Sequence, residues 1–416
     1  MKKNVGNEII YLSSPNINVC FKARISRDFS DEVFKKSVKT VENRHPILKC
    51  VIKTDANGQK VYQNGGGISI QFYSADELNW LEWRDETDNI PFDFENGPLV
   101  KIAVLRGVDY VDIVVLGHHI IGDGIGYLNL TRDFLKALDG CLDDEALELP
   151  EKNQLKKKNG GLLLHLFAKS LNKKWQKDSR NFSQTEFVKF FMQYREQNPA
   201  GVYLADTGKN FLPRLKAICK AREITINEAI ATAFIRAVQT QNGGKKVRLG
   251  VAASIRNELN ISAPHHMGNF VTGVAVEVEN AEDTPFKLRE QLSRPKKRYQ
   301  AIHLLNKLER PLIESVMYAA YGGYNNPAAQ KLAAILGEKK EDKAFGITNL
   351  GVQEFEGFSF TVDDVWFVGP AFPQNFLTVG VMTVGGVVKF CLRYSQSELN
   401  ERQVDKIFQG VVKEVE

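Results

Sequence analysis

The chain has 416 residues, of which 43% are hydrophobic and 25% charged, and this composition excludes a disordered chain, a collagen and a coiled coil. At roughly 100–200 residues per domain, the length predicts two lobes that each bury a core of their own. Lys and Arg outnumber Asp and Glu by 55 to 50, a surplus too small to indicate a nucleic-acid-binding protein.

The first part of the chain predicts strands around one capped helix. From 18 to 25, apolar residues alternate with polar or small neighbours, as in a half-buried strand. Ser30 precedes two acidic residues and a run of apolar residues at helical spacing, which predicts a helix from Ser30 to about Asn43 that Pro46 ends. The further strands predicted here are 47–52, 60–62, 68–72, 99–105 and 110–116, with one hairpin turn at Asn57–Gly58 and another at 106–109.

A polar and basic stretch follows the predicted N-terminal lobe of residues 1–150. We interpret residues 151–185 as a linker, and 186–416 as the C-terminal lobe. Residues 155–175 leave a second interpretation open, a basic amphipathic helix that contacts a membrane surface or an acidic carrier.

The C-terminal part predicts a second series of strands and helices. A helix from 227 to 241 ends at Asn242–Gly243–Gly244, and a final helix from 398 to 412 has Ser397 as its expected cap. The strands predicted between them are 247–253, 270–278, 345–350, 362–368, 377–384 and 387–392. Both halves therefore mix antiparallel-rich sheet with packed helices, and the predicted class is α/β or α+β in two similar lobes.

The cysteines and the N-terminus predict a reduced, cytoplasmic protein. The five cysteines are scattered without a CxxC pair, so neither a disulfide framework nor a zinc site is indicated. The first ten residues lack the apolar run of a signal peptide. The apolar stretch Gly161–Ala168 is far shorter than the roughly 20 residues that span a bilayer.

The segment 114–127, VVLGHHIIGDGIGY, carries the strongest chemical signal. Its glycines permit a sharp strand-to-helix turn and the close approach of a substrate to the main chain. A phosphate-binding loop is disfavoured because Tyr127 stands where a third glycine is needed and Asp123 would repel pyrophosphate. A metal site is disfavoured because the adjacent His118 and His119 diverge and no HExxH motif accompanies them. A histidine general base and a buried, hydrogen-bonded histidine pair remain, and the glycines and Asp123 favour the base.

This segment resembles a known family. Residues 118–124 match the HHxxxDG signature of the chloramphenicol-acetyltransferase-like superfamily, which includes nonribosomal peptide condensation domains, alcohol acetyltransferases and polyketide-associated acyltransferases. Further similarities are Arg44–Leu48 to the RHPxLR element, Gly97–Leu99 before the active-site hairpin, Ser254–Asn257 with Gly268–Phe270 in the region that crosses between lobes, and Thr348–Gly351 to the SNxG element. The DFGWG motif of the plant branch is absent, which disfavours that branch.

The resemblance implies a fold and a base. It implies a pseudo-dimeric V of two lobes with a central tunnel. It implies that His119 takes a proton from an acceptor hydroxyl or amine as this group attacks a thioester carbonyl, and that His118 supports the geometry. Asp123 is expected in a salt bridge away from the substrate, with Arg256 as its partner.

The same resemblance suggests supporting residues. Gly124 and Asn269 are expected to support the site, whereas Thr348 and Asn349 are candidates for contacts with the acyl thioester. No bound metal or permanent cofactor is implied. Acyl-coenzyme A or an acyl carrier thioester would be the co-substrate.

The resulting hypothesis is a monomeric acyltransferase. It would use a coenzyme A or carrier-protein thioester, a non-aminoacyl group and a small alcohol or amine acceptor, and it would transfer directly because no GxSxG elbow and no activated cysteine motif is present. The alternatives are an amide-forming condensation enzyme of peptide natural-product biosynthesis and a non-catalytic binding member of the same fold. The sequence does not choose between ester and amide products or between the two thioester donors.

Overall fold

The computed structural model describes residues 2–15, 17–143, 145–148, 161–258, 264–294, 299–338 and 344–415. Most of the polar beginning of the predicted linker, residues 151–160, lies outside the described residues. From Leu162 the linker forms helix α4 (Leu162–Trp175).

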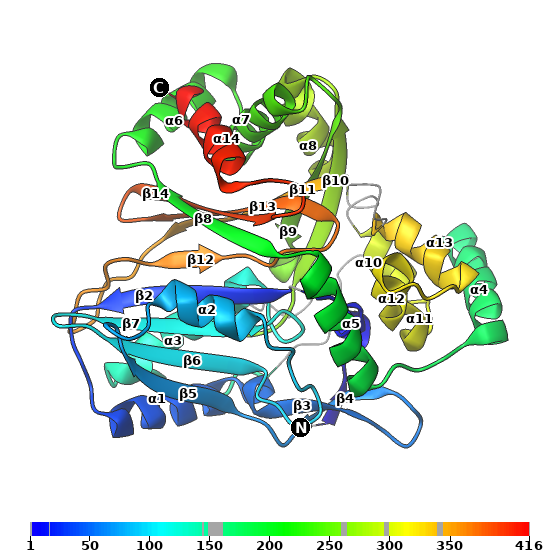
Figure 1. The fold of residues 1–416 in the computed structure, drawn as a ribbon, viewed down its shortest axis with the longest axis horizontal. Coiled ribbons are helices and arrows are strands. Elements are labelled where there is room, and N and C mark those ends of the chain that lie inside the picture. Colours follow the sequence, from blue (N-terminus) through cyan, green and yellow to red (C-terminus); the bar gives the residue numbers. More distant parts are fainter. Residues whose placement is uncertain are drawn as a thin grey trace.

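A five-stranded sheet with the order β12-β2-β7-β6-β5 forms the centre of the N-terminal lobe (Figure 1). All eight residues of the inner strand β7 are buried, which explains its nearly continuous apolar sequence. Both predicted hairpins are confirmed, since β6 pairs antiparallel with β7 and β3 with β4. The strands are β2 (Asn18–Ile25), β5 (Ile68–Ser74), β6 (Val100–Arg106), β7 (Val111–His118) and β12 (Trp366–Val368), and a small separate sheet holds β1 (Lys2–Asn4), β3 (Cys50–Thr54) and β4 (Lys60–Asn64).

Helices α1 (Asp31–Arg44) and α3 (Gly124–Leu138) pack against each other, and α3 also packs against β2. Helix α2 (Trp80–Asp88) contacts β2, β6 and β7. The predicted Ser30 cap of α1 is confirmed, because its hydroxyl accepts a hydrogen bond from Val33 N at 3.4 Å.

A six-stranded sheet with the order β10-β9-β11-β13-β14-β8 forms the second lobe. Its strand β11 is parallel to both β9 and β13, and the other pairings are antiparallel. Helices α6, α7 and α14 share one hydrophobic core with this sheet. The elements are β8 (Ala200–Asp206), β9 (Val247–Ser254), β10 (Val271–Val278), β11 (Ala344–Gln353), β13 (Asn375–Val384), β14 (Val387–Ser395), α6 (Phe211–Arg222), α7 (Ile226–Gln241), α8 (Thr284–Ser293) and α14 (Glu401–Lys413).

The cap predicted for the last helix is wrong. Asn400, and not Ser397, caps α14: its side chain accepts from Gln403 N at 3.0 Å, and the Gln403 side chain accepts from Asn400 N at 2.9 Å. The Ser397 hydroxyl is instead 2.8 Å from that of Ser395. The reciprocal pair satisfies two helix-terminal donors, which a single serine three residues earlier does not do.

Strand β12 joins the two lobes. It comes from the C-terminal part of the chain but pairs antiparallel with β2 of the N-terminal sheet. It is shorter than the predicted strand 362–368, of which Val362 forms only an isolated bridge to Ile25. The interruption has a physical cause, since Asp364 turns its carboxylate to Lys22 and Lys389, at 2.7 and 2.6 Å.

A helical group lies beside the two sheets in Figure 1. Side chains of α4, α5 and α10–α13 pack into the same core as the N-terminal sheet. The remaining elements are α5 (Gln184–Gln197), α10 (Gln300–Leu305), α11 (Arg310–Glu314), α12 (Val316–Tyr321), α13 (Pro327–Leu336) and the short 3-10 turns η1 (Gly6–Tyr11), η2 (Pro46–Lys49), η4 (Gln176–Asp178), η5 (Arg256–Glu258) and η6 (Ala281–Asp283).

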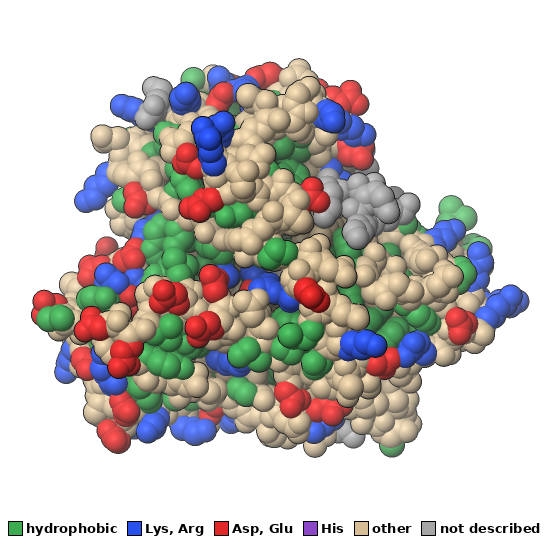
Figure 2. Space-filling model, viewed as in Figure 1, with side chains coloured by type: hydrophobic (Ala, Val, Ile, Leu, Met, Phe, Trp, Pro, Cys, Tyr) green, Lys and Arg blue, Asp and Glu red, His purple; other side chains and the backbone are tan. Residues whose placement is uncertain are grey.

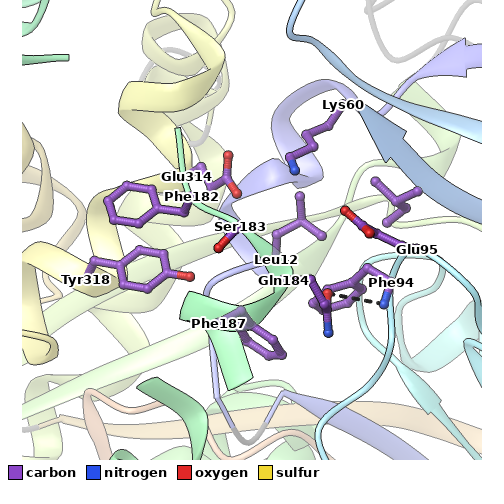
Figure 3. A pocket seen from close by; sticks show the side chains of 11 residues that line it. Leu12, Lys60, Phe94, Glu95, Phe182, Ser183, Gln184, Phe187, Glu314 and Tyr318 are labelled. Atoms are coloured by element: carbon purple, nitrogen blue, oxygen red, sulfur yellow. Dashed lines mark hydrogen bonds between the residues drawn. The ribbon is translucent and has the colours of Figure 1, made fainter. Parts of the chain in front are cut away.

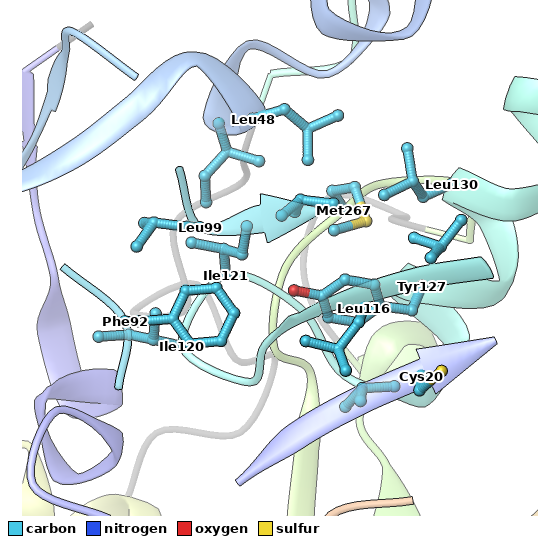
Figure 4. Close-up of a cluster of buried hydrophobic side chains, with 14 of the residues drawn as sticks. Cys20, Leu48, Phe92, Leu99, Leu116, Ile120, Ile121, Tyr127, Leu130 and Met267 are labelled. Atoms are coloured by element: carbon cyan, nitrogen blue, oxygen red, sulfur yellow. The ribbon is translucent and has the colours of Figure 1, made fainter. Parts of the chain in front are cut away.

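The core under the histidine segment draws on both halves of the chain. Figure 4 shows Met267, which lies between β9 and β10, among Leu116, Ile121 and Tyr127. A Cβ on Gly122 would lie only 2.9 Å from the Met267 methyl group, so the turn and the second lobe approach closely.

Acidic and basic side chains are interspersed over the face of the molecule in Figure 2. Such a surface creates no large field of one sign. In the described part of the chain, no helix combines the length and the apolar character needed to cross a bilayer.

Candidate active site

The two histidines stand where strand β7 gives way to helix α3. His118 is the last residue of β7, and Asp123 is the N-cap of α3. Gly117 makes room for this turn, because a Cβ there would lie 2.2 Å from the Tyr127 hydroxyl. That hydroxyl donates to the His118 carbonyl at 2.8 Å and so ties the helix back to the strand. The predicted sharp strand-to-helix turn is confirmed.

His118 is a buried, neutral residue that shapes the turn. Its Nδ1 accepts a hydrogen bond from Ile120 N at 3.2 Å. Its ring packs edge-on against Phe94 and Phe92, with centroids 4.9 and 5.5 Å away. Burial, and to a smaller extent His119, lowers the pKa of His118 to about 3. At neutral pH the ring therefore carries no charge.

Residues from distant parts of the chain hold the His119 ring. The Asn269 Nδ2 lies 2.9 Å from His119 Nδ1 and donates to the His119 carbonyl oxygen at 3.1 Å. Tyr11 packs on one side of the ring at a centroid distance of 4.9 Å, and Phe372 lies 6.0 Å away. The His119 main-chain N–H donates to the Ile17 carbonyl at 3.2 Å. Ring and backbone are both fixed.

The electrostatic setting keeps His119 neutral. Burial lowers its pKa, while the charge of Asp123 and a hydrogen bond to the residue's own carbonyl act in the opposite direction. Because burial has the largest effect, the net shift is downward, and the neutral imidazole dominates at pH 7. A neutral imidazole is the form that can accept a proton.

Asp123 and Arg256 form the predicted ion pair, which is confirmed at 2.6 Å between Asp123 Oδ1 and Arg256 Nη2. The same carboxylate accepts from Gly126 N at 2.7 Å and Phe270 N at 2.8 Å. One carboxylate thus caps helix α3, pairs with a guanidinium and binds the backbone of the second lobe. Asp123 is oriented away from His119 chemistry and toward structure.

Arg256 extends this connection along the β9–β10 segment. It donates to the carbonyl oxygens of His266 at 2.8 Å and Gly268 at 3.2 Å, and it lies over the Phe270 ring at 4.6 Å. These contacts hold the backbone on either side of Asn269. The ion pair therefore positions the amide that contacts His119.

The structure brings Gly124 and Asn269 to the site, as predicted. Gly124 lies under Leu350 and Phe367, and a Cβ there would be 3.1 Å from Leu350 Cδ2. The predicted substrate contacts of Thr348 and Asn349 stay predictions. Asn349 already donates to the Asn227 side chain at 2.5 Å and accepts from Gly351 N at 2.8 Å, so its amide also serves the local backbone.

The sequence gave no sign of Tyr11, Phe372 or Phe94 beside the histidines. Burial raises the pKa of Tyr11 to about 12, and a hydrogen bond with Asn269 acts against this shift. The phenol therefore stays protonated at neutral pH. Single aromatic residues more than 100 positions from the motif carry no pattern that marks them. The described residues contain no group of three or more His, Cys, Asp or Glu side chains arranged to hold a metal ion.

The sequence is similar to known proteins over most of its length. A family model described as "Condensation domain" matches residues 12–304, which are more than half of the chain. Tyrocidine synthase 2 of Brevibacillus parabrevis is 25% identical over 283 residues. These residues make up 63% of this chain but 8% of that synthase, so the chain spans a small part of the curated relative's length.

Solved structures with the same fold cover the whole chain. The TRI3 trichothecene 15-O-acetyltransferase of Fusarium sporotrichioides superposes with a TM-score of 0.69 at 12% identity, covering 100% of this chain and 95% of that one. The condensation domain of the monacolin K polyketide synthase MokA gives 0.65 at 13% identity, with 100% and 96% covered. The predicted two-lobed α/β fold is confirmed.

Proposed function

Because the chain belongs to the condensation-domain family, we propose that it transfers an acyl group from a thioester to an alcohol or amine acceptor, with His119 as the general base. The donor is acyl-coenzyme A or an acyl carrier protein, and the acceptor is a small molecule. The thioester is a co-substrate, and no permanently bound cofactor takes part.

The fixed, neutral ring of His119 is the observation that carries this proposal. When the proton resides on Nδ1, the ring donates to its own carbonyl, and Nε2 keeps a free lone pair. This nitrogen takes the proton of the acceptor as the acceptor oxygen or nitrogen attacks the thioester carbonyl. When the tetrahedral intermediate collapses, the imidazolium returns the proton to the leaving thiolate. General base catalysis of this kind supplies roughly 10²–10⁴-fold.

The cysteines support direct transfer without an acyl-enzyme. Burial raises the pKa of Cys20 and Cys391 to about 12 and that of Cys50 to about 11. Burial also raises the pKa of Cys219 and Cys141. A thiol is a poor nucleophile at neutral pH when it is not ionised. Asn269 supplies the described side-chain hydrogen bond to His119, and no serine or cysteine does so.

The test is the release of free thiol from a panel of acyl-coenzyme A and acyl carrier thioesters, with amine and alcohol acceptors assayed in parallel. His119→Ala should lower turnover roughly 10²–10⁴-fold without loss of fold. His165→Ala is the matched control, because His165 is an exposed histidine on α4 and should keep full turnover. Turnover by His119→Ala at the wild-type rate would reject His119 as the base.

The same panel separates the alternatives. Release of thiol only with amine acceptors would identify an amide-forming condensation enzyme, and release only with alcohols would identify an ester-forming one. Binding of a thioester without turnover for any acceptor would indicate a non-catalytic member of the fold. Intact-protein mass spectrometry with donor alone should show no acyl adduct, and a stoichiometric adduct that an acceptor removes would overturn direct transfer.

A further inference from the structure

A second pocket lies on the far side of the aromatic layer that packs against His118. It encloses about 320 Å³, part of which opens to solvent (Figure 3). Phe94 forms one wall and stands between His118 and Phe187, with ring centroids 4.9 and 5.0 Å from them. The opposite wall consists of Phe182 and Tyr318, whose rings stack at 3.9 Å. The acyl-transfer site proposed above does not include this space.

A buried carboxylate without a partner faces this pocket. Glu314 is 5% exposed, and neither of its carboxylate oxygens has a hydrogen bond or ion pair with any described residue. The Ser13 hydroxyl binds the main-chain oxygen of Glu314 and leaves the side chain free. Burial raises the Glu314 pKa to about 7, against the effect of Lys60 and together with that of Glu186. A carboxyl group kept dry in this way has an unmet need for a cation.

The cation that the chain itself offers does not reach Glu314. In Figure 3 the Lys60 and Glu314 side chains point toward each other from opposite walls, but they form no ion pair within 4.0 Å. The Lys60 ammonium instead donates to the Thr54 hydroxyl at 3.1 Å. Glu95 adds a second carboxylate to the lining. The acids therefore outnumber the lysine among the residues that line the pocket.

We propose that this pocket binds a small organic ammonium ion, with its charged nitrogen at Glu314 and its carbon chain against Phe182 and Tyr318. Aromatic faces attract cations, and a desolvated carboxylate strengthens this attraction. The volume suits a ligand with a short alkyl or arylalkyl chain. Phe94 separates the ligand from His118, so binding does not require acyl transfer.

Isothermal titration calorimetry of the full chain tests this site, with phenethylamine as the probe and 2-phenylethanol as its neutral match. We expect a dissociation constant for the amine of about 1 mM or lower, and at least tenfold weaker binding of the alcohol. Glu314→Gln should weaken amine binding at least tenfold. Glu338→Gln is the matched control, since Glu338 is also a buried carboxyl residue with a raised pKa, about 8, but does not line the pocket.

Two further variants keep the test decisive. Lys60→Met removes the competing cation and should tighten amine binding severalfold even if Glu314→Gln does not fold. His119→Ala should bind the amine as the wild type does, so a failed acyl-transfer assay leaves this result intact. Equal affinity for amine and alcohol, no binding of the amine, or unchanged binding by both pocket variants would overturn the site.

Discussion

Two buried charged junctions connect the lobes, and they differ in their balance of charge. At the first, Asp123 meets one guanidinium, that of Arg256, and two backbone N–H groups. At the second, Asp88 of α2 pairs with Arg393 of β14, and two more arginines approach its Oδ2, Arg84 at 3.8 Å and Arg195 at 3.6 Å. The first junction is balanced, whereas the second holds more positive charge than its one buried carboxylate neutralises.

The surplus charge is visible in the groups themselves. Burial lowers the pKa of Arg393 to about 10, and Asp88 only partly offsets this effect. Arg84 Nε and Nη1 are buried without hydrogen-bond partners. The Asn18 amide donates to Asp88 at 2.8 Å, and Asn18 is the strand partner of His118, so this junction also borders the site. The comparison teaches that a similar buried pairing can either position a catalytic loop or hold lobes together under electrostatic stress.

Removal of Asp88 should give the largest effect. Asp88→Asn leaves three arginines without a buried counter-charge, and we expect a loss of about 5 kcal/mol in the free energy of unfolding. Urea denaturation followed by circular dichroism measures this loss. Asp85→Asn is the control, because Asp85 is 57% exposed, and it should change stability by less than about 1 kcal/mol. A small effect at Asp88 would mean that the cluster is already solvated.

Breaking the balanced junction should cost less stability but more function. We expect Asp123→Asn and Arg256→Met each to lower the free energy of unfolding by about 3 kcal/mol and to reduce turnover by displacing Asn269 from His119. The double variant should lose less than the sum of the two, because the pair acts as a unit. Additive losses in the double-mutant cycle would contradict this coupling.

Acid should distinguish the junctions through Asp88. Burial raises the pKa of Asp88, but Arg393 first and then Arg84 and Arg195 outweigh it and hold the value at about 2, below the ordinary 3.8. Its contribution to stability is complete above about pH 4 and disappears as the pH falls toward 2, by about 2 kcal/mol. Denaturation curves between pH 2 and 5 should show this slope in the wild type and lack it in Asp88→Asn.

The smallest effect sharpens the contrast most. Arg84→Met removes surplus positive charge and buried unpaired donors, so the free energy of unfolding should stay within about 1 kcal/mol of the wild type or rise. Arg256→Met, the same change at the balanced junction, serves as the comparison. A loss of about 3 kcal/mol at Arg84 would show that the second junction is not overcharged.

Local patterns predicted much of the fold. The Asn57–Gly58 hairpin, the Ser30 cap and the glycine-flanked histidine turn depend on neighbouring residues, and the structure confirms them. The resemblance, and not any local pattern, identified Arg256 as the partner of Asp123. The Ser397 cap failed because Asn400 and Gln403 form a reciprocal pair that competes for the same helix end.

Tertiary assembly explains what the sequence did not reveal. Asp88 and Arg393 are 305 residues apart, and neither stands in a motif. Tyr11 reaches His119 from a 3-10 turn near the N-terminus, which shows no periodic pattern. Such sites depend on the packing of three or four separate segments, and the alternation of apolar and polar residues along one segment does not encode it.

Strand β12 sets an order of events for synthesis on the ribosome. Strands β2, β5, β6 and β7 are all made by residue 118, but the strand that covers the outer edge of β2 begins at Trp366. At roughly 5–20 residues per second, the ribosome needs about 10–50 s to make the chain between them. During that time β2 presents unpaired N–H and C=O groups to other nascent chains. The first lobe is therefore finished only after most of the second has been translated, and a fragment that stops before β12 is expected to aggregate.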